Sequence, residues 1–270
     1  MIVATNGKKR VPYPRLAYTV ARDIAYYLDG DAARMVRRTE GELSDDEDRV
    51  AESPSGAPWI PDVLSNGRLT MFIAGNPGAG KSYLAREMID NLPPNYDILL
   101  FTALEEEDGN FRDFGDRLYK IKMTPENLKS ITLSAIRARS AHPVLLFDDI
   151  DKIRDKTVEK LTYALLEDAL ANGRGHKKHD GTGDIHTIVT SHSLNDYKKT
   201  KYTLENSDYV GLFPGSTTKA QYVRMFQKLG LPMELCDETY ELGKRGDVRS
   251  IIIKKVAPMY IIYGHVIELI

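Results

Sequence analysis

Residues 68–82 read RLTMFIAGNPGAGKS, in which an apolar segment runs directly into a glycine-rich one. The apolar part is rich in β-forming side chains and predicts a strand. The glycine-rich part, Gly75–Ser82, fits the pattern G-x-x-x-x-G-K-[ST]. Apolar residues then recur at helical spacing, at Leu84, Met88, Ile89 and Leu92. A strand, a glycine loop and a helix in this order form a phosphate-binding loop, so the stretch predicts a nucleotide site.

The residue types of this loop suit a triphosphate. Glycines let the backbone N–H groups point at phosphate oxygens, and the following helix adds its positive N-terminal end. Lys81 is expected to reach the outer phosphates, and the Ser82 hydroxyl to ligate Mg²⁺. We therefore expect ATP and Mg²⁺ as cofactors. The expected nucleotide-binding residues are Gly75, Asn76, Pro77, Gly78, Ala79, Gly80, Lys81, Ser82 and Tyr83.

A second acidic segment completes the expected site. The sequence VLLFDDID at 144–151 predicts a buried strand that ends in carboxylates. Asp148 is expected to hold Mg²⁺, through water, and Asp149 to orient or deprotonate the attacking water. Asp151 is expected to cap the next helix. Because a P-loop kinase needs no base at this point, the doubled acid favours an ATPase.

The whole chain fits an α/β fold. From Arg68 onward apolar strands alternate with amphipathic helices, the pattern of a mostly parallel sheet with helices on both faces. One helix is expected to open at Thr124-Pro125, a capping hydroxyl followed by proline, and another to stop at Asn172-Gly173. Residues 250–270 predict a C-terminal β-hairpin. We expect an ATPase domain over 68–270, preceded by an N-terminal extension over 1–67.

The N-terminal extension differs in composition from the rest. Apolar residues between Arg15 and Arg38 recur at helical spacing and predict a helix. The acidic run EGELSDDEDRVAE and the turn-rich SPSGAPWIP then predict a linker. A minority hypothesis is that the acidic run shields a DNA site.

Bulk composition excludes several classes. The chain has 270 residues, a net charge of −2 and one cysteine, which rules out an internal disulfide. No apolar run reaches the roughly 20 residues that span a bilayer, and the first residues lack a signal-peptide core. We expect a soluble protein with no membrane insertion, and a uniformly basic DNA binder is disfavoured.

Two segments near the acids are further candidates. The strand IHTIVTSH places His192 at its polar tip, where it is either a γ-phosphate sensor or a loop cap. The stretch ANGRGHKKHDGTGD, at 171–184, contains Arg174 and the lysines Lys177 and Lys178. These lysines are either DNA-phosphate contacts or part of a solvated loop. A zinc site at His176, His179 and Asp180 is disfavoured because further ligands are missing nearby.

Taken in order, GNPGAGKS, LLFDDID, NGRG, IHTIVTSH and SDYVGLFPGSTTKAQYVRMFQKLGL resemble the genome-packaging ATPases of large eukaryotic DNA viruses and virophages. These belong to the poxvirus-type branch of the FtsK–HerA superfamily, and the resemblance covers about residues 68–265. It implies a RecA-like core that assembles into a homo-oligomeric ring, usually a hexamer, and drives double-stranded DNA into a preformed capsid. It also implies a capsid or portal-vertex partner, and location in the host cytoplasm or viral factory, or in the virion.

The same resemblance assigns roles to residues. It implies catalytic roles for Lys81, for Asp148 with Asp149, and for Arg174 as an arginine acting on the neighbouring subunit. The sensor, often glutamine in the superfamily, would be His192. A second arginine expected near KKTKYTLEN is replaced by lysines, at Lys198, Lys199 and Lys201.

Other classes remain as alternatives. RGDVRS, ending in Ser250, fits a sensor-2 motif of an AAA+ ATPase acting in DNA replication or remodelling, although too little chain follows Arg249 for a lid. A Zot-like phage assembly ATPase would normally carry a transmembrane segment. A small-molecule kinase or nucleotide switch would need a substrate pocket or lid, which the sequence does not indicate.

Overall fold

The structure is a computed structural model of the chain. It describes residues 68–270 apart from 91, 93, 104–108, 176–182, 193–196, 257–258, 264–265 and 270, and within residues 1–67 only the backbone of strands. The chain divides into two compact units, one formed by Arg68–Leu212 and the other by Met1–Gly67 with Phe213–Ile270. The ATPase domain over 68–270 and the extension over 1–67 stay predictions, since these units come from the clustering of contacts.

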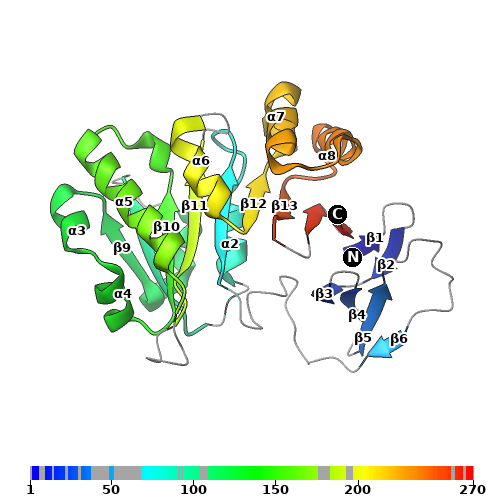
Figure 1. Cartoon of the computed structure of the whole chain (residues 1–270), viewed down its shortest axis with the longest axis horizontal. Coiled ribbons are helices and arrows are strands. Elements are labelled where there is room, and N and C mark those ends of the chain that lie inside the picture. Colours follow the sequence, from blue (N-terminus) through cyan, green and yellow to red (C-terminus); the bar gives the residue numbers. More distant parts are fainter. Residues whose placement is uncertain are drawn as a thin grey trace. The chain divides into compact units, whose positions relative to one another are not determined.

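The unit Arg68–Leu212 is an α/β layer structure, as the sequence predicts (Figure 1). Its strands are β7 (Thr70–Ala74), β8 (Asp97–Thr102), β9 (Leu118–Lys122), β10 (Pro143–Asp148), β11 (His186–Ser191) and β12 (Tyr209–Leu212). Its helices are α2 (Lys81–Asp90), α3 (Pro125–Ser130), α4 (Leu133–Arg139), α5 (Lys156–Asn172) and α6 (Tyr197–Asn206), with 3-10 turns η1 (Gly109–Arg117) and η2 (Ile150–Lys152).

All strands of this unit are parallel, in the order β12-β7-β11-β10-β8-β9. Buried side chains fill β7, β10, β11 and β12 completely, as expected of parallel strands covered on both faces. In Figure 1, α5 and α6 lie in front of the sheet. Since β11 lies between β7 and β10, the carboxyl ends of these three strands meet at one edge of the sheet.

Two helix termini follow the sequence signals. Helix α3 begins after Thr124, whose hydroxyl accepts a hydrogen bond from the N–H of Asn127, with proline in the first turn. Helix α5 ends at Asn172, with Gly173 as its C-cap. The expected cap at the start of α5 is wrong, however, because Asp155 rather than Asp151 accepts the N–H groups of that helix. Asp151 is thereby left for another contact.

The second unit contains helices that the sequence reading did not predict. They are α7 (Lys219–Leu229) and α8 (Met233–Arg245), preceded by the turn η3 (Pro214–Ser216). Thr218 and Gln221 form a reciprocal capping box at the start of α7, and Gly230 and Gly246 close the two helices in the left-handed conformation. Both helices lie before Arg249 in the chain.

The C-terminal hairpin is confirmed and extended. Strands β13 (Ile251–Lys254) and β14 (Tyr260–Tyr263) are antiparallel, and β15 (Val266–Leu269) continues the meander. Two N-terminal strands, β1 (Ile2–Thr5) and β2 (Arg10–Tyr13), follow beside β15.

The expected N-terminal helix is wrong. Residues 15–37 form antiparallel strands β3 (Arg15–Ala21), β4 (Ile24–Asp29) and β5 (Ala32–Arg37), and β6 (Arg49–Ala51) pairs with β5. The apolar positions do recur at helical spacing, but many side chains of the segment, on the stripe and beside it, are β-branched or aromatic and favour strands. Such residues are Tyr18, Thr19, Val20, Ile24, Tyr26 and Tyr27. Gly30 then interrupts any helix of that length.

Candidate active site

The glycine-rich loop lies at the carboxyl end of β7. The Gly75 N–H donates to the Ser191 carbonyl at 3.1 Å, which fixes the loop to the end of β11. Gly78 and Gly80 adopt positive φ angles of 77° and 109°, which side chains with a Cβ rarely reach. Helix α2 then begins at Lys81. The loop therefore presents its backbone and a helix N-terminus at the edge where β10 also ends.

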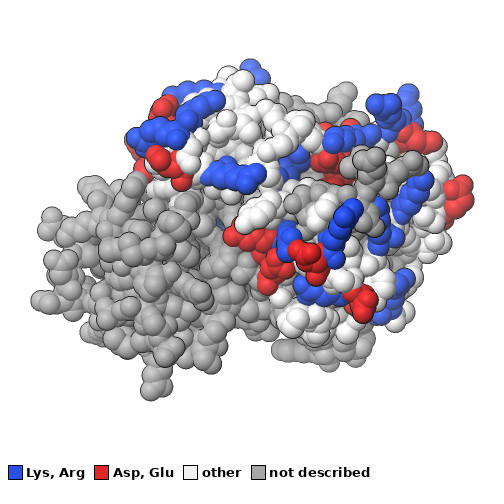
Figure 2. Space-filling view, turned by 180° about the vertical axis from the view of Figure 1, so that it is seen from behind, with Lys and Arg blue, Asp and Glu red and all other residues white. Residues whose placement is uncertain are grey.

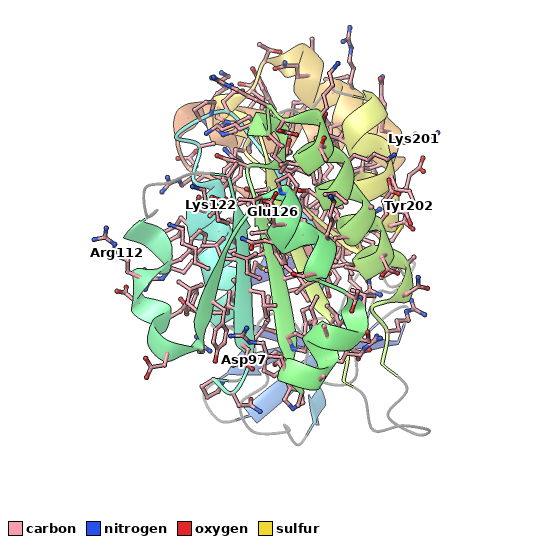
Figure 3. All side chains as sticks on the ribbon, turned by 90° about the vertical axis from the view of Figure 1, so that its left-hand side faces the viewer. Asp97, Arg112, Lys122, Glu126, Lys201 and Tyr202 are labelled. Carbon is pink, nitrogen blue, oxygen red and sulfur yellow. The ribbon has the colours of Figure 1, made fainter. Side chains whose placement is uncertain are left out.

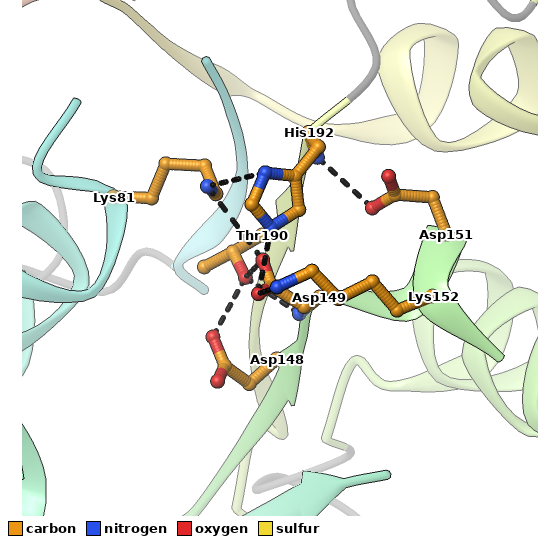
Figure 4. Close-up of polar contacts among 7 residues, drawn as sticks. All are labelled: Lys81, Asp148, Asp149, Asp151, Lys152, Thr190 and His192. Atoms are coloured by element: carbon orange, nitrogen blue, oxygen red, sulfur yellow. Dashed lines mark hydrogen bonds and ion pairs between the residues drawn. The ribbon is translucent and has the colours of Figure 1, made fainter. Parts of the chain in front are cut away.

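Lys81 is buried and directed at two groups from the neighbouring strands. Only 6% of the residue is exposed. Its Nζ lies 3.3 Å from His192 Nδ1 and 3.7 Å from Asp149 Oδ1 (Figure 4). Burial lowers the pKa of the Lys81 ammonium, and the charge of Asp149 opposes that shift without cancelling it. The acid that follows β10 thus offsets part of the cost of burying the ammonium group.

Asp149 carries the densest set of contacts in this cluster. Its Oδ2 accepts hydrogen bonds from Lys152 Nζ and from His192 Nε2, both at 2.8 Å. Burial raises the pKa of the Asp149 carboxyl, but the hydrogen bonds from Lys152 and His192 and the charge of Lys81 outweigh it and hold that pKa below its ordinary value. The group is therefore a carboxylate at neutral pH, as a base must be.

The hydrogen bonds also define the state of His192. A protonated lysine only donates, so His192 Nδ1 accepts from Lys81 and Nε2 carries the proton that is donated to Asp149. In this tautomer the imidazole uses both nitrogens. Its backbone N–H donates to Asp151 Oδ1 at 2.9 Å, which is the contact that Asp151 makes instead of capping α5. The structure thus joins His192 to both predicted reactive groups.

Thr190 connects the two acids. Its hydroxyl, on β11, accepts from the Asp149 N–H at 2.8 Å and donates to Asp148 Oδ1 at 2.8 Å. Asp149 is the one described non-glycine residue with positive φ, at 50°, and this bond supports that strained conformation. The sequence reading assigned the polar strand tip to sensing but did not predict this bridge.

Replacing Thr190 with valine should lower the free energy of unfolding by about 1–3 kcal/mol, because a buried N–H and a buried carboxylate oxygen each lose a partner. Urea denaturation would measure the change. Thr187→Val is the matched control, since Thr187 lies on the same strand and its buried hydroxyl has no hydrogen-bond partner among the described residues. Equal destabilisation by the two variants would show that the Thr190 bridge contributes nothing specific.

The residues present fit Mg²⁺ by their chemistry. Ser82 follows Lys81 in the first turn of α2, and Asp148 ends β10 with only 4% exposed. Hydroxyl and carboxylate oxygens are the ligands that Mg²⁺ prefers. When bound, Mg²⁺ neutralises charge on the phosphate oxygens. Within the part of the chain that the structure describes, no cluster of three or more His, Cys, Asp or Glu could hold a metal by itself, and the disfavoured zinc ligands His176, His179 and Asp180 lie outside it.

Arg174 lies at the opposite edge of the sheet. The carbonyl of Gly173 accepts from the Ile185 N–H, immediately before β11, and the Arg68 side chain next to β7 packs against Gly173. Arg137 donates to the Arg174 carbonyl at 3.0 Å. The Arg174 side chain is exposed. The amino ends of the strands thus hold Arg174, whereas the phosphate loop stands at their carboxyl ends.

The other residues that the sequence singled out lie at the surface or outside the described part of the chain. Tyr83 is exposed beside the phosphate loop, with 56% of its surface accessible. Lys177 and Lys178 lie outside the described residues. Lys201, on α6, points outward and pairs with Glu205 at 3.7 Å (Figure 3). Among the described residues on the face shown in Figure 2, cationic and anionic side chains are intermixed.

This fold and this cluster define a P-loop ATPase. Residues 71–201 match the family described as "ATPase family associated with various cellular activities (AAA)". The chain therefore is an ATPase that uses ATP with Mg²⁺.

The chain also matches a virophage protein. Over 201 residues it is 30% identical to "Uncharacterized protein V3" of Sputnik virophage, and the match covers 73% of this chain and 75% of that protein. The chain belongs to the family of this virophage protein.

Matches among solved structures are distant. A DnaB-like replicative helicase has 12% identity and a TM-score of 0.41, covering 75% of this chain and 58% of that chain. The pCW3 conjugation coupling protein TcpA, with ATPγS, has 11% identity and a TM-score of 0.37, covering 54% and 49%. EccC of Thermomonospora curvata has 14% identity and a TM-score of 0.35, covering 56% and 30%. The chain spans less than two thirds of each of these solved chains.

Among the described residues, no helix combines the length and the apolar character needed to cross a bilayer.

Proposed function

We propose that the chain is an ATP-driven translocase of double-stranded DNA that packages a viral genome into a preformed capsid. The observation that carries this proposal is that the chain belongs to a virophage protein family. In the same chain, Lys81, Asp149 and His192 contact one another beside the phosphate loop. The ordered motifs from GNPGAGKS to SDYVGLFP, which resemble the packaging branch of the FtsK–HerA superfamily, support the same function.

Each residue of the site has a role in this proposal. Lys81 binds the outer phosphates of ATP, and Ser82 and Asp148 hold Mg²⁺. Asp149 orients and deprotonates the attacking water, and His192, in contact with both Lys81 and Asp149, reports the state of the phosphates.

The proposal also includes a ring. Arg174 is too far from its own phosphate loop to take part in hydrolysis there, so it acts on the next subunit of a homo-oligomer, which we propose is a hexamer. Lys177 and Lys178 contact DNA phosphates without reading sequence, and a capsid or portal-vertex protein receives the ring. The host cytoplasm or viral factory, or the virion itself, is the place of action.

Measuring ATP turnover with and without double-stranded DNA, alongside light scattering, tests this function. We expect an oligomer whose turnover rises with DNA of any sequence and whose stimulation weakens as salt increases, because phosphate contacts release counterions. Turnover that ignores DNA but rises with a protein or small-molecule substrate would overturn the packaging proposal.

The main competing function is that of an AAA-type remodelling or replication factor. Two observations favour it as the second candidate: the match of residues 71–201 to the AAA family, and the helical pair α7–α8 that follows β12. Stimulation by single-stranded DNA or by a protein, in the absence of any response to duplex, would identify this function instead.

A further inference from the structure

Lys152 touches the candidate base but has no role in the mechanism above. It ends the short turn η2, three residues after Asp149, and its N–H donates to the Asp149 carbonyl at 3.0 Å. Its Nζ lies 2.8 Å from Asp149 Oδ2 (Figure 4). The Lys152 side chain is 45% exposed, in contrast to Lys81, so it belongs to the outer wall of the cluster rather than to the phosphate loop.

The two oxygens of Asp149 are held unequally. Oδ2 accepts from both Lys152 and His192 at 2.8 Å. Oδ1 has only longer contacts, at 3.5 Å with the Thr190 hydroxyl, which makes its shorter bond of 2.8 Å to Asp148, and at 3.7 Å with Lys81 Nζ. One oxygen is therefore fixed by two short hydrogen bonds, whereas the other makes a looser ion pair with the phosphate-binding lysine.

This asymmetry matters once ATP is bound. Lys81 then turns to the phosphates, and Asp149 loses the ion pair on Oδ1. With Oδ2 still held from the outer side, Oδ1 faces the position that Lys81 leaves and hence the nucleotide. A carboxylate gripped through one oxygen can present the other to water in a single orientation.

We propose that Lys152 is a positioning residue for ATP hydrolysis, which holds Asp149 Oδ2 so that Oδ1 faces the attacking water. The inference rests on the proposed role of Asp149 as the group that activates water. Lys152 adds a charge-assisted hydrogen bond to the one that His192 makes with the same oxygen.

Steady-state kinetics of Lys152→Met, which keeps length and removes the charge, tests this inference on the full-length protein. We expect kcat to fall about 10- to 100-fold, since small errors in the placement of a catalytic group cost up to about 100-fold. KM for ATP should stay within about threefold, because Lys152 does not contact the phosphate loop. Lys152→Arg should recover most of kcat, because a guanidinium can still donate to Oδ2.

Lys156→Met is the matched control, since Lys156 is an exposed lysine at the start of α5 and makes no contact with the cluster in the described structure. It should leave kcat and KM unchanged. A kcat of Lys152→Met equal to that of wild type, a loss confined to KM, or a loss that arginine does not rescue would overturn the positioning role.

Asp149→Asn tests the role of Asp149 separately from the role of Lys152. If this variant retains turnover, the proposed role of Asp149 fails and the inference about Lys152 fails with it. If Asp149→Asn is inactive while Lys152→Met is fully active, only the inference about Lys152 is wrong. Thermal unfolding of each variant would show whether a loss of activity reflects a loss of fold.

Discussion

Replacing Arg174 with alanine should reduce ATP turnover of the assembled protein by about 10³–10⁵-fold, the range that an arginine supplied to a phosphoryl-transfer site contributes. Turnover of dilute, dissociated subunits should be slow in wild type and variant alike. A coupled assay of ATP hydrolysis, run across protein concentrations that span assembly, measures both effects.

The reason is the position of Arg174 in the fold. It follows α5, which begins beyond the carboxyl end of β10 and returns to the amino ends of the strands, where Gly173 bonds to Ile185. The five residues of β7 alone separate the two edges by about 17 Å. An arginine side chain cannot bridge that distance while Arg137 holds its carbonyl. Any catalytic action of Arg174 must therefore be on another subunit.

Mixing two inactive variants tests this directly. Lys81→Ala subunits have an intact Arg174, and Arg174→Ala subunits have an intact phosphate loop. In a ring with head-to-tail contacts, random mixing at equal amounts leaves about a quarter of the interfaces with both parts. Partial recovery of turnover on mixing is expected. No recovery in mixed oligomers, or full activity of Arg174→Ala alone, would contradict action in trans.

The part of the site predicted from the sequence is the part that local patterns determine. The glycine-rich loop, the strand that ends at Asp148 and the stop of α5 at Asn172 each depend on residues adjacent in sequence. Strand order is not local, so the position of β11 between β7 and β10 came only from the structure. That position brings His192 and Thr190 to the acids and explains why a strand tip far along the chain belongs to the site.

Where the sequence reading failed, competing local signals were present. The apolar residues of 15–37 fit both a helical stripe and alternating strands, and their β-branched and aromatic neighbours favour strands. The start of helix α7 could have been predicted from the sequence, because Thr218 and Gln221 have the spacing of a capping box. Lys152 had no sequence signal, because a lysine three residues after an acid is common on exposed turns. Only the structure shows that Lys152 and His192 bind the same oxygen of Asp149.

Replacing Lys81 with alanine should lower ATP turnover by at least about 10²–10³-fold, the loss typical of removing a single preorganised donor to developing charge. Lys81 is the buried cation of the phosphate loop, and no other lysine or arginine begins α2. Turnover is measured with radiolabelled ATP, and binding with a fluorescent ATP analogue, so that loss of affinity and loss of chemistry are distinguished.

Without nucleotide, the same substitution should cost little stability. Lys81 donates to His192 and faces Asp149, but burial of its ammonium opposes those gains, as the lowered pKa of Lys81 indicates. Lys152 and His192 continue to hold Asp149 Oδ2 in the variant. We therefore expect the free energy of unfolding of Lys81→Ala, measured in urea, to lie within about 1 kcal/mol of that of wild type, while its turnover is lost. Wild-type turnover by a folded Lys81→Ala protein would mean that the loop at 75–82 is not the hydrolysis site.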